Sequence, residues 1–137
     1  MGYTHYWRIN GAMNAEVFAI FSRECEVLAK VSGIPIANGA GEIGTIPEFS
    51  KELVSFNGIG KDSHETFYFN ITGEGFNFCK TQEKPYDELV TACLILLKYY
   101  FSFVEVSSDG DKEDWQKGVQ LFRKVFPYRE IGIWFLK

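Results

Sequence analysis

The chain has 137 residues, of which 46% are hydrophobic and 17% aromatic, and it carries a net charge of −4. This composition excludes intrinsic disorder, and the length fits one domain spanning residues 1–137. The acidic balance argues against a general nucleic-acid-binding protein, although it leaves room for a local basic pocket. No apolar run reaches the about 20 residues that a membrane span needs, so no membrane partner is expected.

The ends and the cysteines bear on localisation. The first ten residues lack the basic and apolar regions of a signal peptide. Cys25, Cys79 and Cys93 are odd in number and far apart, which favours reduced thiols over a disulfide framework or a zinc site. We therefore expect a cytoplasmic protein.

The first part of the chain predicts a strand, a helix and a long loop. Residues 3–9 are rich in aromatic side chains and predict a strand with its odd-numbered residues on one face. Asn14 is a suitable N-cap for a helix of apolar residues at helical spacing, and Gly33 is well placed to end it. Residues 34–49 are rich in glycine and proline and predict a loop whose length is typical of functional loops.

The middle of the chain predicts three strands. Residues 53–56 and 64–72 favour the first two, the latter with alternating aromatic residues. Phe76 and Phe78 belong to the third, and as its most apolar residues they are expected on the core face. Alternation then places Cys79 on the opposite face, where it is more simply a small buried filler than a catalytic thiol.

The last part predicts a central helix and three further elements. Pro85 suits the first turn of a helix, and residues 89–97 are apolar around most of its circumference. A strand at residues 103–106, an amphipathic helix at 115–126 and a closing strand at 131–137 are expected to follow.

The element order β-α-β-β-β-α-β-α-β favours the α+β class. We expect a mostly antiparallel sheet with about three helices on one face. The nearest standard description is a ferredoxin-like split βαβ core with a C-terminal helix and strand.

One edge of this sheet is the candidate ligand site. A strand-helix-strand crossover makes its two strands parallel, so the strand ending near Lys80 and the strand ending near Ser107 finish together with the start of the helix. A helix N-terminus attracts anions, and lysines and hydroxyl groups would add to that attraction. Ordinary helix capping and turn chemistry is the structural alternative. The candidate ligand-binding residues are Lys80, Thr81, Lys84, Tyr86, Asp87, Ser107, Ser108 and Asp109.

Other motifs give weaker indications of function. Residues 39–44 match a dinucleotide-binding glycine pattern but follow a helix rather than a strand, so no cofactor is expected. His5 could serve in acid–base chemistry, but on an aromatic strand it is more often a hydrogen-bonded core residue. With two histidines in the chain and scattered acids, we expect no metal site. The aromatic residues could stack nucleobases, but without interleaved basic residues we interpret them as core.

Several sequence blocks together resemble a known family. They are YTHYW at residues 3–7, FNG at 56–58, ETF at 65–67, FCKTQEKPYD at 78–87 and VSSDG at 106–110. In this order they are similar to a family of small, uncharacterised proteins encoded by bacteria, fungi and phages. The resemblance implies no activity, but it draws attention to the candidate edge and adds His5, Asn57 and Cys79 as further candidates. A phage origin would imply residence in the host cytoplasm and a counter-defence role.

Three functions follow as expectations. The first is a binding protein for a small anionic, phosphate- or nucleotide-like ligand at the helix N-terminus near Lys84. The second is a phage or mobile-element protein that inhibits a host enzyme or defence system through protein contact. The third is a hydrolase or transferase that acts on a phosphorylated substrate through Cys79, His5 or Asp109, although the sequence shows no complete set of catalytic residues. The sequence leaves open whether the protein is an enzyme.

Overall fold

A computed structural model describes residues 3–137 of the chain. Its strands and helices alternate irregularly along the sequence, and short 3₁₀ turns lie at Gly60–Asp62 and Trp134–Leu136. The elements are β1 (Thr4–Ile9), α1 (Ala15–Ser32), β2 (Glu48–Phe49), β3 (Leu53–Phe56), β4 (Phe67–Asn70), β5 (Gly75–Lys80), α2 (Asp87–Tyr100), β6 (Glu105–Ser108) and α3 (Gln116–Val125).

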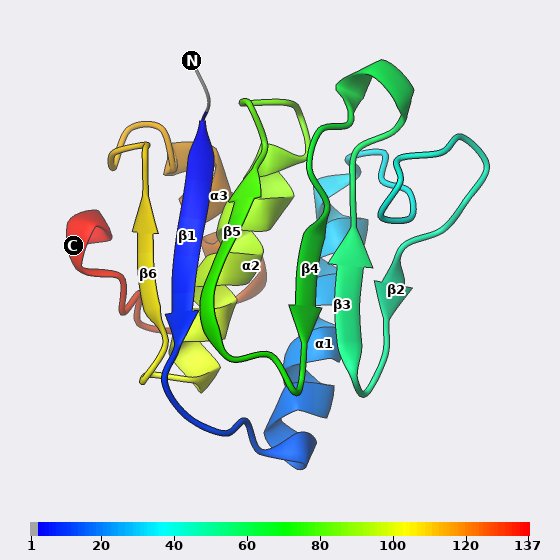
Figure 1. Ribbon diagram of the computed structural model, residues 1–137. Helices are drawn as coiled ribbons and strands as arrows, with labels where there is room; N and C mark the ends of the chain where they lie inside the picture. Colours follow the sequence, from blue (N-terminus) through cyan, green and yellow to red (C-terminus); the bar gives the residue numbers. More distant parts are fainter. Residues whose placement is uncertain (1–2) are drawn as a thin grey trace.

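The strands form two antiparallel sheets, in the orders β5-β1-β6 and β2-β3-β4. Figure 1 shows the two sheets side by side with all three helices behind them, so that the opposite face of the strands is not covered by a helix. Because β5 and β6 both run antiparallel to β1, they are parallel to each other and α2 makes the crossover between them. The predicted α+β class, with three helices and a split βαβ unit, is confirmed.

The helices form where the sequence predicts them. The Asn14 side chain accepts hydrogen bonds from the first amides of α1, and Gly33 ends this helix in the left-handed conformation at φ 67°. Helix α2 is the centre of the core, because every residue from Leu89 to Leu97 is buried. No helix among residues 3–137 has the length and apolarity that a membrane crossing requires.

Two local predictions are wrong. The closing strand expected at residues 131–137 is instead an extended segment followed by a 3₁₀ turn, although Ile131 and Ile133 are buried as a strand pattern would require. Phe76 and Phe78 do not face the core: they are 54% and 56% exposed, whereas Cys79 is fully buried on the helix side. The register explains this, because Cys79 lies opposite the buried His5 and directly opposed residues share a face of the sheet.

The loop at residues 34–49 is held against the sheet by Asn57. Its amide group accepts hydrogen bonds from the backbone amides of Gly58 and His64 and donates to the carbonyl oxygens of Gly39 and His64. Ala37 also pairs with Asn57 through the backbone. The buried Asn57 thus anchors a loop, and none of these bonds leaves it directed at a ligand.

Candidate functional site

The expected edge contains a chain of hydrogen-bonded polar side chains, which we call the edge network. His5 Nε2 lies 2.6 Å from Asp87 Oδ1, and His5 Nδ1 lies 2.7 Å from Ser108 Oγ. The Thr81 hydroxyl donates to the same Asp87 oxygen at 2.6 Å, and the Trp115 indole Nε1–H donates to Ser108 Oγ at 3.0 Å. The network therefore joins the start of β1 and the ends of β5 and β6 to the starts of α2 and α3.

Hydrogen-bond donors around Ser108 assign the protons of the network. Its oxygen accepts from two obligate donors, the Trp115 indole and the Gly110 amide at 2.9 Å. Both lone pairs are then used, so the Ser108 hydroxyl donates to His5 Nδ1. Because His5 Nδ1 accepts this bond, the ring N–H of His5 is at Nε2, which donates a hydrogen bond to Asp87. Every polar side chain of the network has a partner.

The order serine, histidine, aspartate resembles the arrangement of a nucleophile, a base and an orienting acid. A nucleophilic oxygen, however, needs a free lone pair directed at a substrate, and the Ser108 oxygen has none. His5 is also 0% exposed, with Tyr3 and Trp115 packed edge-on against its ring at centroid distances of 5.1 and 5.0 Å. These contacts make the edge network a structural element, as the core interpretation of His5 anticipated.

The polar groups on the buried side of β5 also have partners within the protein. The hydroxyl group of the buried Tyr86 donates to the carbonyl oxygen of Glu65 at 2.6 Å, and Cys79 Sγ lies 3.5 Å from the same oxygen. Burial is the main cause that raises the pKa values of the Cys79 thiol and the Tyr86 phenol well above their ordinary values. A thiol that resists ionisation is a poor nucleophile, which supports the inert interpretation of Cys79.

Asp109 is also fully engaged by its neighbours. Its two carboxylate oxygens accept hydrogen bonds from the Tyr6 hydroxyl at 2.9 Å and from the Thr4 amide at 3.0 Å. The bond to Asp109 is the main cause that raises the pKa of Tyr6. Asp109 thus fixes Tyr6 on the uncovered side of the sheet, where Ser107 is exposed as well.

A cavity of about 470 Å³ lies beside the start of α2, where an anion was expected. Lys84 and Lys117 line it together with five carboxylates, from Glu83, Asp87, Glu88, Glu113 and Asp114. Acidic residues also occupy the first turn of α2 and offset the positive end of its dipole. The charge of this cavity disfavours an anion. The residues that the structure describes contain no cluster of three or more His, Cys, Asp or Glu that could hold a metal ion.

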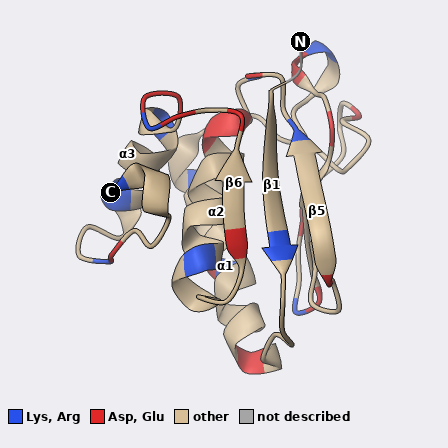
Figure 2. Cartoon of the chain, turned by 60° about the vertical axis from the view of Figure 1, so that its left-hand side comes forward, with Lys and Arg blue, Asp and Glu red and all other residues tan. Residues whose placement is uncertain are grey.

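The uncovered side of β1 and β5 carries a second candidate site, which we call the aromatic face: Tyr6, Arg8, Phe76, Phe78 and Lys80. The Tyr6 and Phe76 rings are stacked at 5.8 Å with an interplanar angle of 24°, and the Phe76 and Phe78 centroids lie 6.2 Å apart. The Arg8 guanidinium lies 5.6 Å from the centre of the Phe76 ring. Figure 2 shows the basic positions of β1 and β5 at opposite ends of these strands.

Of the eight residues proposed from the sequence, the structure gathers Thr81, Asp87 and Ser108 in one network through His5. Asp109 and Lys80 lie at the aromatic face, whereas Lys84 lines the acidic cavity. The aromatic residues themselves were missed as site residues. The signal that could have found them is the pairing of β1 with β5. His5 lies opposite Cys79, so burial of His5 places Cys79 on the buried face and turns the neighbouring Phe78 outward.

Comparisons with protein-family models, with curated protein sequences and with solved structures found no match to this chain.

Proposed function

We propose that this protein binds single-stranded nucleic acid by stacking bases on the aromatic face. The observation that carries the proposal is the position of Phe76 and Phe78, which are each more than half exposed on β5. Full burial of a phenylalanine side chain contributes about 1.5–3 kcal/mol, and each of these half-exposed rings forgoes roughly half of that. An adjacent pair of exposed rings beside Tyr6 is therefore best explained by a ligand that covers them.

Nucleobases are the ligand class that suits this surface. Every base has a flat π-face, and stacking on an aromatic side chain contributes about 1–3 kcal/mol per base. In one widespread class of RNA-binding domain, a sheet stacks two or three bases on the aromatic residues of its strands. The three rings of the aromatic face lie on neighbouring strands with helices only behind them, which is the same arrangement of platform and support.

A few cations lie near the rings and can contact the phosphate backbone of a bound strand. Arg8 and Lys80 flank the rings. The acidic residues beside them are Asp109, which binds the Tyr6 hydroxyl and the Thr4 amide, and Glu105, which lies opposite Arg8. The net charge of −4 makes non-specific electrostatic attraction weak. Stacking would then supply most of the affinity, and duplex DNA, whose bases are not accessible for stacking, would bind poorly.

This proposal keeps a nucleotide-like anionic ligand and moves it from Lys84 to the aromatic face. Lys80 is shared by both versions. From the sequence, nucleic-acid binding was disfavoured by the acidic balance and by the lack of basic residues among the aromatic ones, which were therefore interpreted as core. Phe76 and Phe78 are instead exposed, with Arg8 and Lys80 on the same face. A hydrolase or transferase is not proposed, because Cys79 and His5 are fully buried and Asp109 is engaged by the Tyr6 hydroxyl and the Thr4 amide.

The test is the binding of fluorescently labelled single-stranded RNA and DNA of random sequence, followed by anisotropy. Wild type is compared with Phe76→Ala/Phe78→Ala and with Tyr128→Ala, which removes a fully exposed aromatic ring elsewhere. We expect wild type and Tyr128→Ala to bind, and the double variant to lose at least about tenfold in affinity. Binding of neither RNA nor DNA by wild type, or equal binding by all three proteins, contradicts the proposal.

A further inference from the structure

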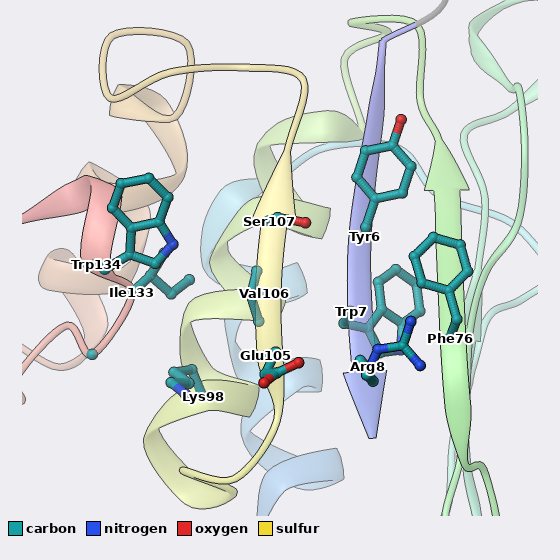
Figure 3. Close-up of a pocket in the computed structure, with 11 residues that line it drawn as sticks. Tyr6, Trp7, Arg8, Phe76, Lys98, Glu105, Val106, Ser107, Ile133 and Trp134 are labelled. Carbon is teal, nitrogen blue, oxygen red and sulfur yellow. The ribbon is translucent and has the colours of Figure 1, made fainter. Parts of the chain in front are cut away.

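A groove of about 550 Å³ runs from the aromatic face across the edge strand β6. Tyr6, Arg8 and Phe76 line its beginning, and the segment containing Ile133 and Trp134 lines its far side. Figure 3 shows β6 between these two groups, with Trp134 on the side away from Tyr6. Within residues 3–137, β6 pairs with β1 alone, and the groove lies beside its other edge.

We propose that this groove carries the nucleic-acid strand onward from the aromatic face, so that one further base stacks on Trp134. The inference rests on the proposed function and specifies its ligand. A mononucleotide or dinucleotide covers the rings of β1 and β5 alone, whereas a longer strand also reaches Trp134. The preferred ligand is then an oligonucleotide rather than a free nucleotide.

The exposure of Trp134 is the first support. Its side chain is 75% exposed, whereas the other two tryptophans of the chain, Trp7 and Trp115, are 1% and 0% exposed. The ring is not free to turn in all directions, because Phe135 packs edge-on against it at a centroid distance of 5.5 Å. A large indole held in place at the wall of a groove is suited to stacking on a planar ligand.

The charge of the groove is the second support. The Lys98 ammonium donates hydrogen bonds to the carbonyl oxygens of Ser102 and Val104, both at 2.7 Å. An ammonium has three N–H donors, so one is left for a ligand in the groove that Lys98 lines. Lys98 and Arg8 are opposed by one acidic residue of the lining, Glu105, and this balance favours a phosphate group.

The test uses uridylate dinucleotide and tetranucleotide as probes of wild type, Trp134→Ala and Trp134→Phe. We expect Trp134→Ala to bind the tetranucleotide about 5- to 150-fold more weakly and the dinucleotide unchanged. Trp134→Phe keeps a stacking ring and should retain most of the tetranucleotide affinity. Because Trp134 is the exposed tryptophan, its emission also reports directly, and the tetranucleotide should quench it while the dinucleotide does not.

The outcomes separate the two proposals. Binding of both probes with no effect of Trp134→Ala, or an equal loss for both probes, overturns the assignment of the groove and leaves the aromatic face standing. Failure of wild type to bind either probe overturns the proposed function and the groove together.

Discussion

The edge network and the aromatic face share strand β1, yet they use its side chains in opposite ways. In the edge network, polar groups such as His5 are buried, and each is matched by a partner within the protein. In the aromatic face, apolar rings such as Phe78 are more than half exposed and lie beside other exposed rings. Buried polar groups that hydrogen-bond to one another stabilise the fold. Exposed apolar rings that no part of the protein covers are available to a ligand.

The largest expected effect is on stability and comes from the edge network. His5→Ala leaves the Ser108 hydroxyl and the Asp87 carboxylate without their partner, and we expect it to lower the free energy of unfolding by about 2–5 kcal/mol. Lys84→Ala is the matched control in the same region, with an expected change of about 0.5 kcal/mol or less. Denaturant unfolding measures both. A fully stable His5→Ala variant would show that the network does not support the fold.

The next effect is on affinity and comes from the aromatic face. Phe76→Ala alone should weaken binding of single-stranded RNA by about 1–3 kcal/mol, because one stacking platform is lost. Its free energy of unfolding should change by no more than about 1 kcal/mol, the contribution of a cross-strand aromatic pair. Anisotropy and denaturant unfolding on the same protein provide both values. A Phe76→Ala variant that loses stability but keeps its affinity would show that the aromatic face supports the fold and does not bind the ligand.

A smaller effect is the response of stability to alkaline pH. The pKa values of Cys79 and Tyr86 are raised in the folded protein, mainly by burial, so both groups keep their protons where the unfolded chain would lose them. Unfolding therefore releases protons above the ordinary thiol pKa of 9.0, and stability should fall as the pH rises beyond it. Each such group contributes up to about 1.4 kcal/mol per pH unit.

The control for this prediction is Cys79→Ala, which should have a shallower slope of unfolding free energy between pH 9 and pH 10 than wild type. Below about pH 8 the two slopes should agree, because neither group ionises in either state. An identical slope for both proteins above pH 9 would mean that the Cys79 thiol ionises as freely in the fold as in the unfolded chain.

The smallest effect is on the salt dependence of binding. For a dinucleotide, which covers the aromatic face alone, the two flanking cations are Arg8 and Lys80. The logarithm of its association constant should therefore fall with the logarithm of salt concentration with a slope of about −1.4. Arg8→Ala should reduce this slope to about −0.7. A steep slope, as for a protein with many phosphate contacts, would show that electrostatics rather than stacking governs binding.

The sequence was sufficient for the features that depend on connectivity. The crossover from β5 through α2 to β6 places Thr81 and Asp87 beside Ser108 whatever the side chains do, and the structure shows that proximity. The central position of α2 also followed, because its apolar residues cover most of the circumference.

The sequence was insufficient to predict which face of a strand is buried, because this depends on the strands with which it pairs. Both faces of β5 carry groups that tolerate burial, phenylalanines on one and Asn77 and Cys79 on the other, so hydrophobicity alone chose the wrong face. At the C-terminus, the alternation that buries Ile131 and Ile133 was correct about burial and wrong about pairing, since that segment pairs with no strand in the part of the chain described.

The most direct test of the central claim is to map a bound strand onto the protein by NMR. Backbone amide shifts of wild type are recorded with and without single-stranded RNA. The account predicts changes along β1 and β5 around Tyr6, Phe76 and Phe78, with the amides of the acidic cavity near Lys84 unaffected. Changes that gather around Lys84, Glu88 and Lys117 and leave β5 untouched would contradict it and return the ligand to the start of α2.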